Sequence, residues 1–418
     1  MQKYVIITPC VTNMGGAQMY VRNKCVYMQS IGWDVDIITS QRGIVYISDL
    51  KKYDFIIPEL GFDYFLFSKS TRERITNRII GRIYKKEYDK VIIESTCIPE
   101  STWAEAIAKK CGAHHMLYNL QEYNLIESNI EKDYLKFKYL RHELAGIVNS
   151  SLYDMFLPFW PIEKEKSYYL PAYCTNVVED VELDRLILSE ISKQQYDFAV
   201  GCLSRIDKPF IVHALGDFLS YAAAHHNTKY LLLMIGGAPE GSSFERTIRK
   251  MVNGVKNVGL IITGYLFPVP AKLLDVCDVF FTSAGSSWVC MRSGVPTITY
   301  DGNDFKPIGI LGRTTNNSLK RNENEPALLL SNLLDDILLK NFYPKKPATH
   351  NLSIVDFSMH NIFLSEMKSK SEYFDFDKVI LSRDEKKLSL LLRLIGAENY
   401  YKLGAWKKKV LNKSTSDR

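Results

Sequence analysis

Short apolar runs alternate with amphipathic segments along the first forty residues. Residues 4–8 form an apolar run, a glycine-containing loop follows over 13–16, and a second apolar run covers 35–39. Between the loop and the second run, apolar side chains recur at the three- and four-residue intervals of one helix face. They are Ala17, Val21, Cys25 and Met28. The pattern predicts a strand, a helix and a second strand.

The same alternation continues to residue 300. We expect further strands over 90–93, 115–120, 146–149, 198–202, 230–235, 260–263, 279–282 and 297–300. Helical stretches separate them, which is typical of parallel sheets covered by helices on both faces. Residues 158–195 interrupt the rhythm with several prolines and charges, and a linker is expected within 172–195. The pattern predicts an α/β protein with two tandem doubly wound parallel-sheet (Rossmann-like) domains.

We predict three parts of the chain with different roles. An N-terminal Rossmann-like domain covers residues 1–176, a second Rossmann-like domain covers 177–375, and a helical extension with a basic tail covers 376–418. Ligands of doubly wound sheets bind beyond the carboxyl ends of the strands. The ligand site is therefore expected in a cleft between the two domains.

Composition and charge favour folded domains and argue against nucleic acid as a partner. The 418 residues are 46% hydrophobic and 24% charged, which is a globular balance. The net charge of +6 lies mostly in the tail, where residues 402–418 hold five Lys and one Arg against one Asp. A nucleic-acid groove needs basic residues spread over the folded body. The body is nearly neutral.

The cysteines and the termini suggest a cytoplasmic protein. The eight cysteines include no CxxC pair and no metal-ligand spacing, so we expect reduced thiols and no metal site. The first residues show no pattern of a secretory signal, and no apolar run of about 18 residues could span a membrane.

Two basic segments are candidates for contact with an anionic membrane. Residues 69–90 predict a helix with an isoleucine stripe flanked by basic residues. The stripe is Ile75, Ile79 and Ile83, and the flanking residues include Arg74, Arg78 and Arg82. Packing of this stripe on the sheet is favoured over contact with lipid, because a helix between two strands needs a core face. The tail at 406–409 (WKKK) is the second candidate.

A loop with two adjacent glycines follows the first strand and opens the first helix. Gly15 and Gly16 permit close approach of the backbone to a ligand, and the free N–H groups of the helix start favour an anionic or hydroxyl-rich one. The loop lacks the Lys-Ser/Thr of a Walker motif and the GxGxxG fingerprint. A tight turn without a ligand is the alternative, and the loop alone leaves both open.

Four stretches in order resemble retaining GT-B glycosyltransferases of family 4. Residues 15–39, from the GGAQ loop to the second strand, are similar to the start of the family's first domain. Residues 201–208 (GCLSRIDK) resemble its Gly-x-Leu-x-x-x-Lys stretch. Residues 234–237 and 264–265 resemble its nucleotide-binding turns, and 278–296 its donor loop, helix and Gly-x-Pro. The resemblance implies the GT-B architecture.

The resemblance also implies roles for individual residues. Arg205 and Lys208 would hold the donor diphosphate, since fixed cations stabilise charge that develops on a leaving group. The expected donor-binding residues are Gly15, Gly16, Gly236, Gly237, Tyr265, Ser283, Gly285, Ser286, Ser287 and Asp304. No metal and no cofactor besides the nucleotide-sugar substrate is implied.

The chain departs from the family in one respect, because it lacks the family's Glu-x7-Glu pair. Val289 stands at the position of the second Glu, and the loop 283–287 is too short to hold the first. Because a helix is expected from about Trp288, the backbone N–H groups of 285–287 could bind a phosphate instead.

Asp304, after the strand 297–300, is a candidate for binding sugar hydroxyls, although such Asp-Gly-Asn-Asp sequences also form plain turns.

On the acceptor side, Glu122 follows the strand 115–120 and is the candidate carboxylate for an acceptor hydroxyl. His114 and His115, at the start of that strand, are expected to be structural.

The sequence therefore predicts a metal-independent glycosyltransferase of the hexosyltransferase type. It would move a sugar from a nucleotide sugar to a glycan acceptor, expected to be lipid-linked, in bacterial surface polysaccharide assembly such as capsule or O-antigen, with retention as the resemblance implies. Two alternatives stay open. One is a sugar-nucleotide epimerase of the same fold, and the other is a non-catalytic GT-B subunit that scaffolds a partner.

Overall fold

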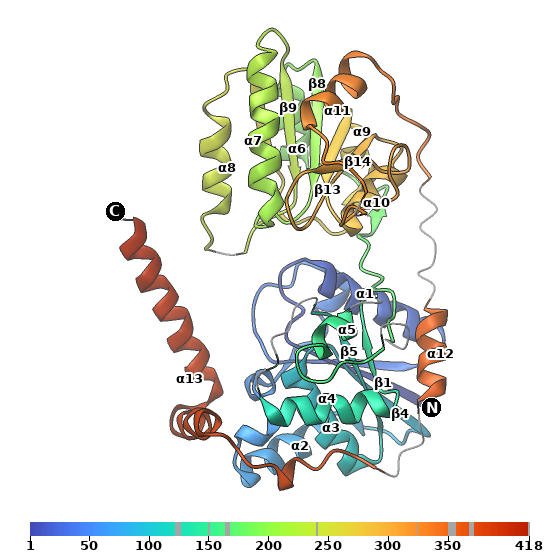
Figure 1. The fold of residues 1–418 in the computed structure, drawn as a ribbon, viewed down its shortest axis with the longest axis vertical. Helices are drawn as coiled ribbons and strands as arrows, with labels where there is room; N and C mark the ends of the chain where they lie inside the picture. Colours follow the sequence, from blue (N-terminus) through green and yellow to red (C-terminus); the bar gives the residue numbers. More distant parts are fainter. Residues whose placement is uncertain are drawn as a thin grey trace.

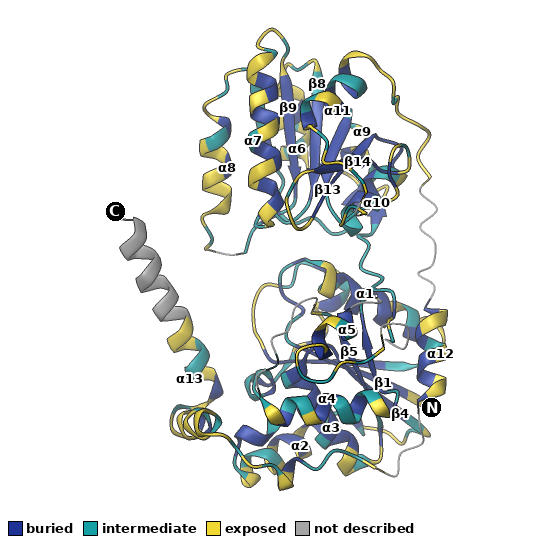
Figure 2. Cartoon of the chain, viewed as in Figure 1, coloured by how far each residue is buried: buried dark blue, intermediate teal, exposed yellow. Residues whose placement is uncertain are grey.

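The chain forms two α/β domains stacked along its longest axis (Figure 1). The computed structural model describes residues 1–121, 126, 128–148, 151–163, 168–239, 241–322, 324–349, 357–367 and 372–416, with side chains described as far as residue 404. Each domain is built on a six-stranded sheet whose strands are mostly buried (Figure 2). No helix in these ranges is long and apolar enough to cross a bilayer.

The first domain has a parallel sheet in the order β3-β2-β1-β4-β5-β6. Its strands are β1 (Gln2–Thr8), β2 (Asp34–Thr39), β3 (Phe55–Ile56), β4 (Lys90–Ser95), β5 (His114–Asn119) and β6 (Leu144–Gly146). Its helices are α1 (Gly16–Ser30), α2 (Lys69–Ile83), α3 (Ile98–Cys111), α4 (Asn129–Leu140) and α5 (Ser151–Phe156). Three 3₁₀ turns, η1 (Ser48–Leu50), η2 (Pro58–Gly61) and η3 (Tyr64–Leu66), lie between β2 and α2.

The second domain has a sheet in the order β10-β9-β8-β12-β13-β14, with only β14 antiparallel to its neighbour. Its strands are β8 (Phe198–Leu203), β9 (Tyr230–Ile235), β10 (Val258–Ile262), β12 (Val279–Thr282), β13 (Thr297–Tyr300) and β14 (Pro307–Ile310). Its helices are α6 (Arg185–Lys193), α7 (Pro209–Ala224), α8 (Phe244–Val252), α9 (Ala271–Asp275), α10 (Gly285–Arg292) and α11 (Leu330–Leu334). A π turn (Asp335–Leu339) follows α11, and β7 (Val178–Glu179) pairs with β11 (Val269–Pro270).

The end of the chain returns to the first domain. Helix α12 (Ser358–Glu366) lies beside that domain (Figure 1), and Phe357 and Phe363 are buried in the same core as Tyr4. A 3₁₀ turn, η6 (Phe376–Lys378), and α13 (Arg383–Ser416), which is kinked at Gly396, follow, and apolar side chains of both pack into a second core of the first domain. Residues 357–367 therefore pack with the first domain, whereas the predicted second domain ran to 375.

The two tandem parallel-sheet domains confirm the predicted fold class, with local differences. The strand expected over 146–149 ends at Gly146, and the short edge strands β3 and β14 were not predicted. On α1, Val21, Cys25 and Met28 are buried as expected, but Ala17 is exposed in the first turn.

Helix α2 covers the sheet with its isoleucine stripe. Ile75, Ile79 and Ile83 are fully buried, as the favoured interpretation required. The basic side chains beside the stripe contact the protein itself. Arg82 donates to the buried Asp36 carboxylate at 2.8 Å, Arg74 pairs with Glu59 at 3.4 Å, and the Arg78 guanidinium lies 5.1 Å from the Phe55 ring.

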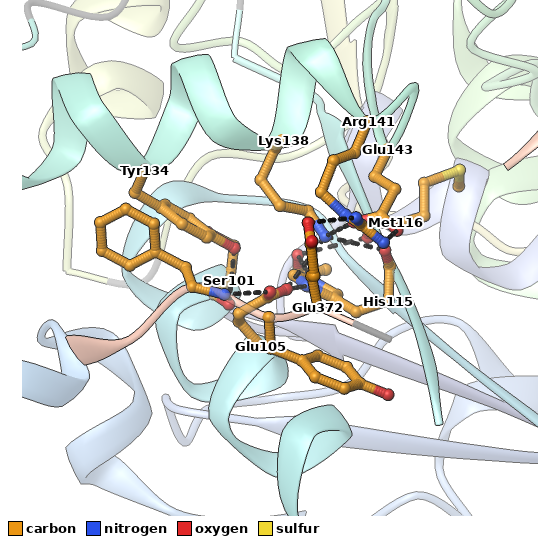
Figure 3. A network of polar contacts seen from close by, with 12 residues as sticks. Ser101, Glu105, His115, Met116, Tyr134, Lys138, Arg141, Glu143 and Glu372 are labelled. Atoms are coloured by element: carbon orange, nitrogen blue, oxygen red, sulfur yellow. Dashed lines mark hydrogen bonds and ion pairs between the residues drawn. The ribbon is translucent and has the colours of Figure 1, made fainter. Parts of the chain in front are cut away.

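A buried network of charged side chains ties α3, α4 and β5 together (Figure 3). Lys138 donates to Glu105 at 3.0 Å and to Glu143 at 2.6 Å. His115 bonds Glu105 at 2.7 Å through Nδ1 and Ser95 at 2.8 Å through Nε2. Burial would raise the pKa of Glu105, but Lys138 and His115 outweigh burial and hold that pKa well below its usual value.

This network is structural, as predicted for His115. The order Ser95, His115, Glu105 is that of a hydrolase triad, but the three side chains are 0–1% exposed, so a substrate cannot reach the serine.

Candidate functional site

A cavity of about 380 Å³ lies between the two domains. Met14, Gly15 and Gly16 line it from the first domain, and Cys174 and Asn176 line it from the connection between the domains. The second domain supplies the rest of the wall from the loops that follow β8, β9, β10, β12, β13 and β14. The cavity therefore lies beyond the carboxyl ends of both sheets, where ligands of such sheets bind.

Three helices begin at this cavity. Helix α1 starts at Gly16, α7 at Pro209 and α10 at Gly285, and all three residues line the wall. The first amide groups of a helix have no carbonyl partner within it and carry a partial positive charge. Three such ends facing one cavity favour an anionic ligand.

Three cationic side chains add formal charge to the cavity wall. They are Arg205, Lys208 and Lys320. Arg205 is held by Asp207 in a two-pronged contact, from Nε to Oδ1 at 3.0 Å and from Nη2 to Oδ2 at 3.1 Å. Lys208 and Lys320 are exposed, and neither forms an ion pair with any residue in the described part of the chain.

Arg205 also spans the gap between the domains. A Cβ atom added to Gly15 would lie 3.3 Å from its Nη1 atom, so the guanidinium contacts the glycine loop of the first domain. A side chain at position 15 would push the arginine away. Gly15 and Arg205, which the resemblance to family 4 assigns to donor binding, are therefore in contact.

Gly236 shapes the turn after β9. Its φ of +149° is in the region that favours glycine, and an added Cβ would lie 1.9 Å from the Ser204 carbonyl oxygen. Gly237 does not line the cavity. An added Cβ there would lie 2.8 Å from the Tyr265 ring, so Gly237 makes room for that ring against the turn.

Tyr265 closes one side of the cavity by contacting the first domain. Its ring centroid is 4.6 Å from that of Tyr46, which follows β2. The Tyr265 hydroxyl is buried and has no partner within the described residues. Burial is the main cause that raises the pKa of this hydroxyl, so it is a neutral donor at physiological pH.

Helix α10 starts about three residues earlier than predicted. The helix begins at Gly285 rather than near Trp288, so the Ser287 amide donates to the Ala284 carbonyl at 3.1 Å and its side chain is fully buried. Only the amides of Gly285 and Ser286 face the cavity wall. Ala284, just before the helix, has a strained φ of +57° and donates to the Ser318 carbonyl at 2.6 Å.

Asp304 does not line the cavity either. It pairs with Arg321, and its carboxylate accepts the Lys306 amide at 3.1 Å. Its neighbour Asp301 accepts the amides of Asn303 and Arg321, each at 2.8 Å. Burial would raise the pKa of Asp301, but these hydrogen bonds lower it. At this turn Gly302 and Asn303 line the wall instead of Asp304.

The structure brings most of the predicted site residues together. The predicted residues on the wall are Gly15, Gly16, Arg205, Lys208, Gly236, Tyr265, Ser283, Gly285 and Ser286. Gly237, Ser287 and Asp304 lie behind it, and Glu122 lies outside the described residues. The sequence analysis missed Lys320, which no local motif marks.

No protein-family model matches the chain, and no curated protein matches it significantly. Solved structures do match. A glycosyltransferase from Rickettsia africae ESF-5 has 13% identity and a TM-score of 0.55, over 95% of this chain and 98% of that one. Anabaena Alr3699/HepE in complex with UDP and glucose has 12% identity and a TM-score of 0.55, over 88% of this chain and 96% of that one.

HepE in complex with UDP-glucose gives a similar result, with 12% identity, a TM-score of 0.54 and coverage of 87% and 98%. These likenesses establish the fold. The chain has the two-domain GT-B fold of glycosyltransferases.

Proposed function

We propose that the chain is a glycosyltransferase that binds a nucleotide-sugar donor between its domains. The observation that carries this proposal is the convergence of three helix starts with Arg205 and Lys208 on one cavity. A nucleoside diphosphate is the leaving group of such a reaction, and fixed positive charge stabilises it as the bond to the sugar breaks. The fold is shared with a protein solved with UDP-glucose, which supports a nucleotide sugar as the ligand.

The proposed mechanism needs no metal and no cofactor. Lys208 and the amides of Gly285 and Ser286 would neutralise the departing diphosphate, which is the task a divalent cation performs in other transferases. Retention of the anomeric configuration rests on the resemblance to family 4. Glu122 remains our candidate for contacting the acceptor hydroxyl.

Lys208→Ala should weaken binding of UDP by about 10- to 100-fold, because a hydrogen bond to a charged group contributes about 1.5–3 kcal/mol. Binding of uridine, which has no phosphates, should change little. Calorimetric titration of both ligands measures the two effects. Lys250→Ala, on the exposed last turn of α8 away from the cavity wall, is the matched control. An equal loss for UDP and uridine would contradict the assignment.

Incubation with a sugar-nucleotide donor and no acceptor distinguishes a transferase from an epimerase. A sugar-nucleotide epimerase would change the configuration of the donor sugar without an acceptor, whereas a transferase would not. A protein that binds no nucleoside diphosphate would instead fit the scaffold alternative.

We further propose a lipid-linked glycan acceptor of bacterial surface polysaccharide assembly, reached at the cytoplasmic face of a membrane through α13. One face of this helix packs on the first domain, where Ser389 donates to the Leu66 carbonyl at 2.6 Å and Leu392 is buried. The opposite face exposes apolar side chains, with Leu390 58% and Leu394 73% exposed. The basic residues Lys386 and Arg393 are exposed on the same part of the helix, before its kink at Gly396, whereas Lys387 pairs with Asp384.

This combination of exposed leucines and basic residues fits an anionic lipid surface. A second copy of the same face would bring like charges together. Helix α2 is a weaker candidate than α13, because its isoleucines are buried.

Leu390→Asp combined with Leu394→Asp should strongly reduce sedimentation with vesicles that contain anionic lipid, because the change removes apolar contact and adds repulsion. Binding of UDP should be unchanged, since α13 does not line the cavity. Ile362→Asp is the control, because Ile362 is an exposed apolar residue (56%) on α12. Vesicle binding that survives the double substitution would rule out this helix face.

A further inference from the structure

The residues described on the wall of the interdomain cavity include cationic side chains and no carboxylate. No Asp or Glu lines it among the described residues. The nearby carboxylates already have partners: Asp207 holds Arg205, and Asp301 and Asp304 accept from Arg321 and from backbone amides. Carboxylates are acceptors for the hydroxyl groups of a neutral sugar, whereas a lysine ammonium can only donate. The described part of the wall therefore offers hydrogen-bond donors where a site for a neutral sugar would be expected to offer carboxylates.

Lys320 is presented to the cavity by a firmly held segment, residues 315–321. The Ser318 carbonyl accepts from the Ala284 amide at 2.6 Å, and the Leu319 carbonyl accepts from the Gly302 amide at 2.7 Å. The Arg321 amide donates to Asp301 at 2.8 Å on the other side of Lys320. Both neighbours of Lys320 in sequence are thus fixed, and the lysine is held beside the start of α10.

The positive charge exceeds what a diphosphate requires. Asp207 cancels the charge of Arg205, which leaves the two formal charges of Lys208 and Lys320. Each of the three helix starts adds about half a charge. A diphosphate ester linked to a sugar carries two negative charges, so positive charge remains for one more anionic group.

We propose that the sugar of the donor is acidic, with a carboxylate that pairs with Lys320, as in a hexuronic acid. This inference rests on the proposed binding of a nucleotide sugar in the cavity and names the class of that sugar. The pairing places Lys320 on the sugar, and Lys208 with the α10 amides on the diphosphate. The absence of the family's Glu-x7-Glu pair would then be an adaptation to a negatively charged sugar, and not a sign that donor binding has been lost.

Calorimetric titrations with UDP, UDP-glucose and UDP-glucuronate test the inference, with GDP and dTDP and their matching sugars used if UDP does not bind. The wild-type protein should bind the uronate about tenfold or more tightly than the glucose donor, as expected for one charge-assisted hydrogen bond. Lys320→Gln should remove this preference and leave the affinity for UDP within about twofold. Lys306→Gln, on an exposed lysine of the neighbouring turn that does not line the cavity, should keep it.

Three results would overturn the inference, and they separate it from the proposed function. Equal affinity of the wild-type protein for both sugar donors would show that the sugar is not selected by charge. A loss of UDP affinity in Lys320→Gln as large as the loss for UDP-glucuronate would move Lys320 to the diphosphate. In both cases the wild-type protein still binds a nucleoside diphosphate, so the proposed function would stand. Failure of all three nucleoside diphosphates to bind would instead reject the proposed function, and the inference with it.

Discussion

Gly236→Ala should lower the free energy of unfolding by about 2–6 kcal/mol and abolish binding of the donor. The added Cβ would lie 1.9 Å from the Ser204 carbonyl oxygen, and the φ of +149° is strained for any residue with a side chain. The carbonyl cannot yield easily, because the turns after β8 and β9 are joined by the bonds from the Ser204 amide to Ile235 and from the Ile206 amide to Gly237, each 3.1 Å. Relief of the clash would displace the adjoining Arg205.

Urea unfolding and titration with UDP measure the two effects. Gly216→Ala is the control, because Gly216 lies inside α7 and an added Cβ there meets nothing within 4 Å. It should raise stability by up to about 1 kcal/mol, since alanine is the better helix former. A Gly236→Ala protein as stable as the wild type that still binds UDP would show that the two turns are not rigid.

Lys138→Met should destabilise the first domain by about 3–5 kcal/mol, which is the usual cost of leaving buried charges without their partner. Lys138 is fully buried and donates to both Glu105 and Glu143, so its loss leaves two carboxylates in the core with less compensation. Lys136→Met, on a more exposed side chain of the same helix, should have little effect. Chemical denaturation of the three proteins gives the comparison.

The same network predicts how stability changes with pH. The pKa of Glu105 is lowered from 4.5 in the folded protein, so its contribution is fully present above that value and is lost as the pH falls below it. Acid unfolding of the wild type should therefore be steep below about pH 4.5. In Lys138→Met, stability at neutral pH should be lower and its fall in acid shallower. An unchanged acid profile would show that Lys138 does not set the pKa of Glu105.

The central strands could be predicted from the sequence because they are buried on both faces. Strand β9 is an uninterrupted apolar run, β12 and β13 combine apolar side chains with threonines, and the predicted and observed bounds of all three agree. The edge strands gave no such signal. Strand β14 begins with Pro307, which only an edge strand tolerates, and β3 has two residues. The helical pattern of α12 is local, but its attachment to the first domain depends on tertiary packing around Phe357.

Part of the candidate site could be predicted for a similar reason. Gly15, Gly236 and Gly285 follow strand ends, so their place beside a ligand cavity is visible in the local sequence. Lys320 was missed because its position depends on hydrogen bonds to distant segments. Asp304 was misplaced for the same reason, since its pairing with Arg321 is a tertiary contact.

The return of α12 and α13 to the first domain has a consequence for synthesis of the chain. A nascent first domain that has left the ribosome still lacks Phe357, Phe363 and Leu392, which complete two of its cores. Among the described residues, the cores of the second domain are formed by one continuous stretch, from β7 to Tyr343. Domains usually fold in the order in which they are made, but here the first to emerge is the last to be completed. Its apolar surface around Tyr4 stays open until the C-terminal helices arrive, so folding of this chain during translation depends on protection of that surface.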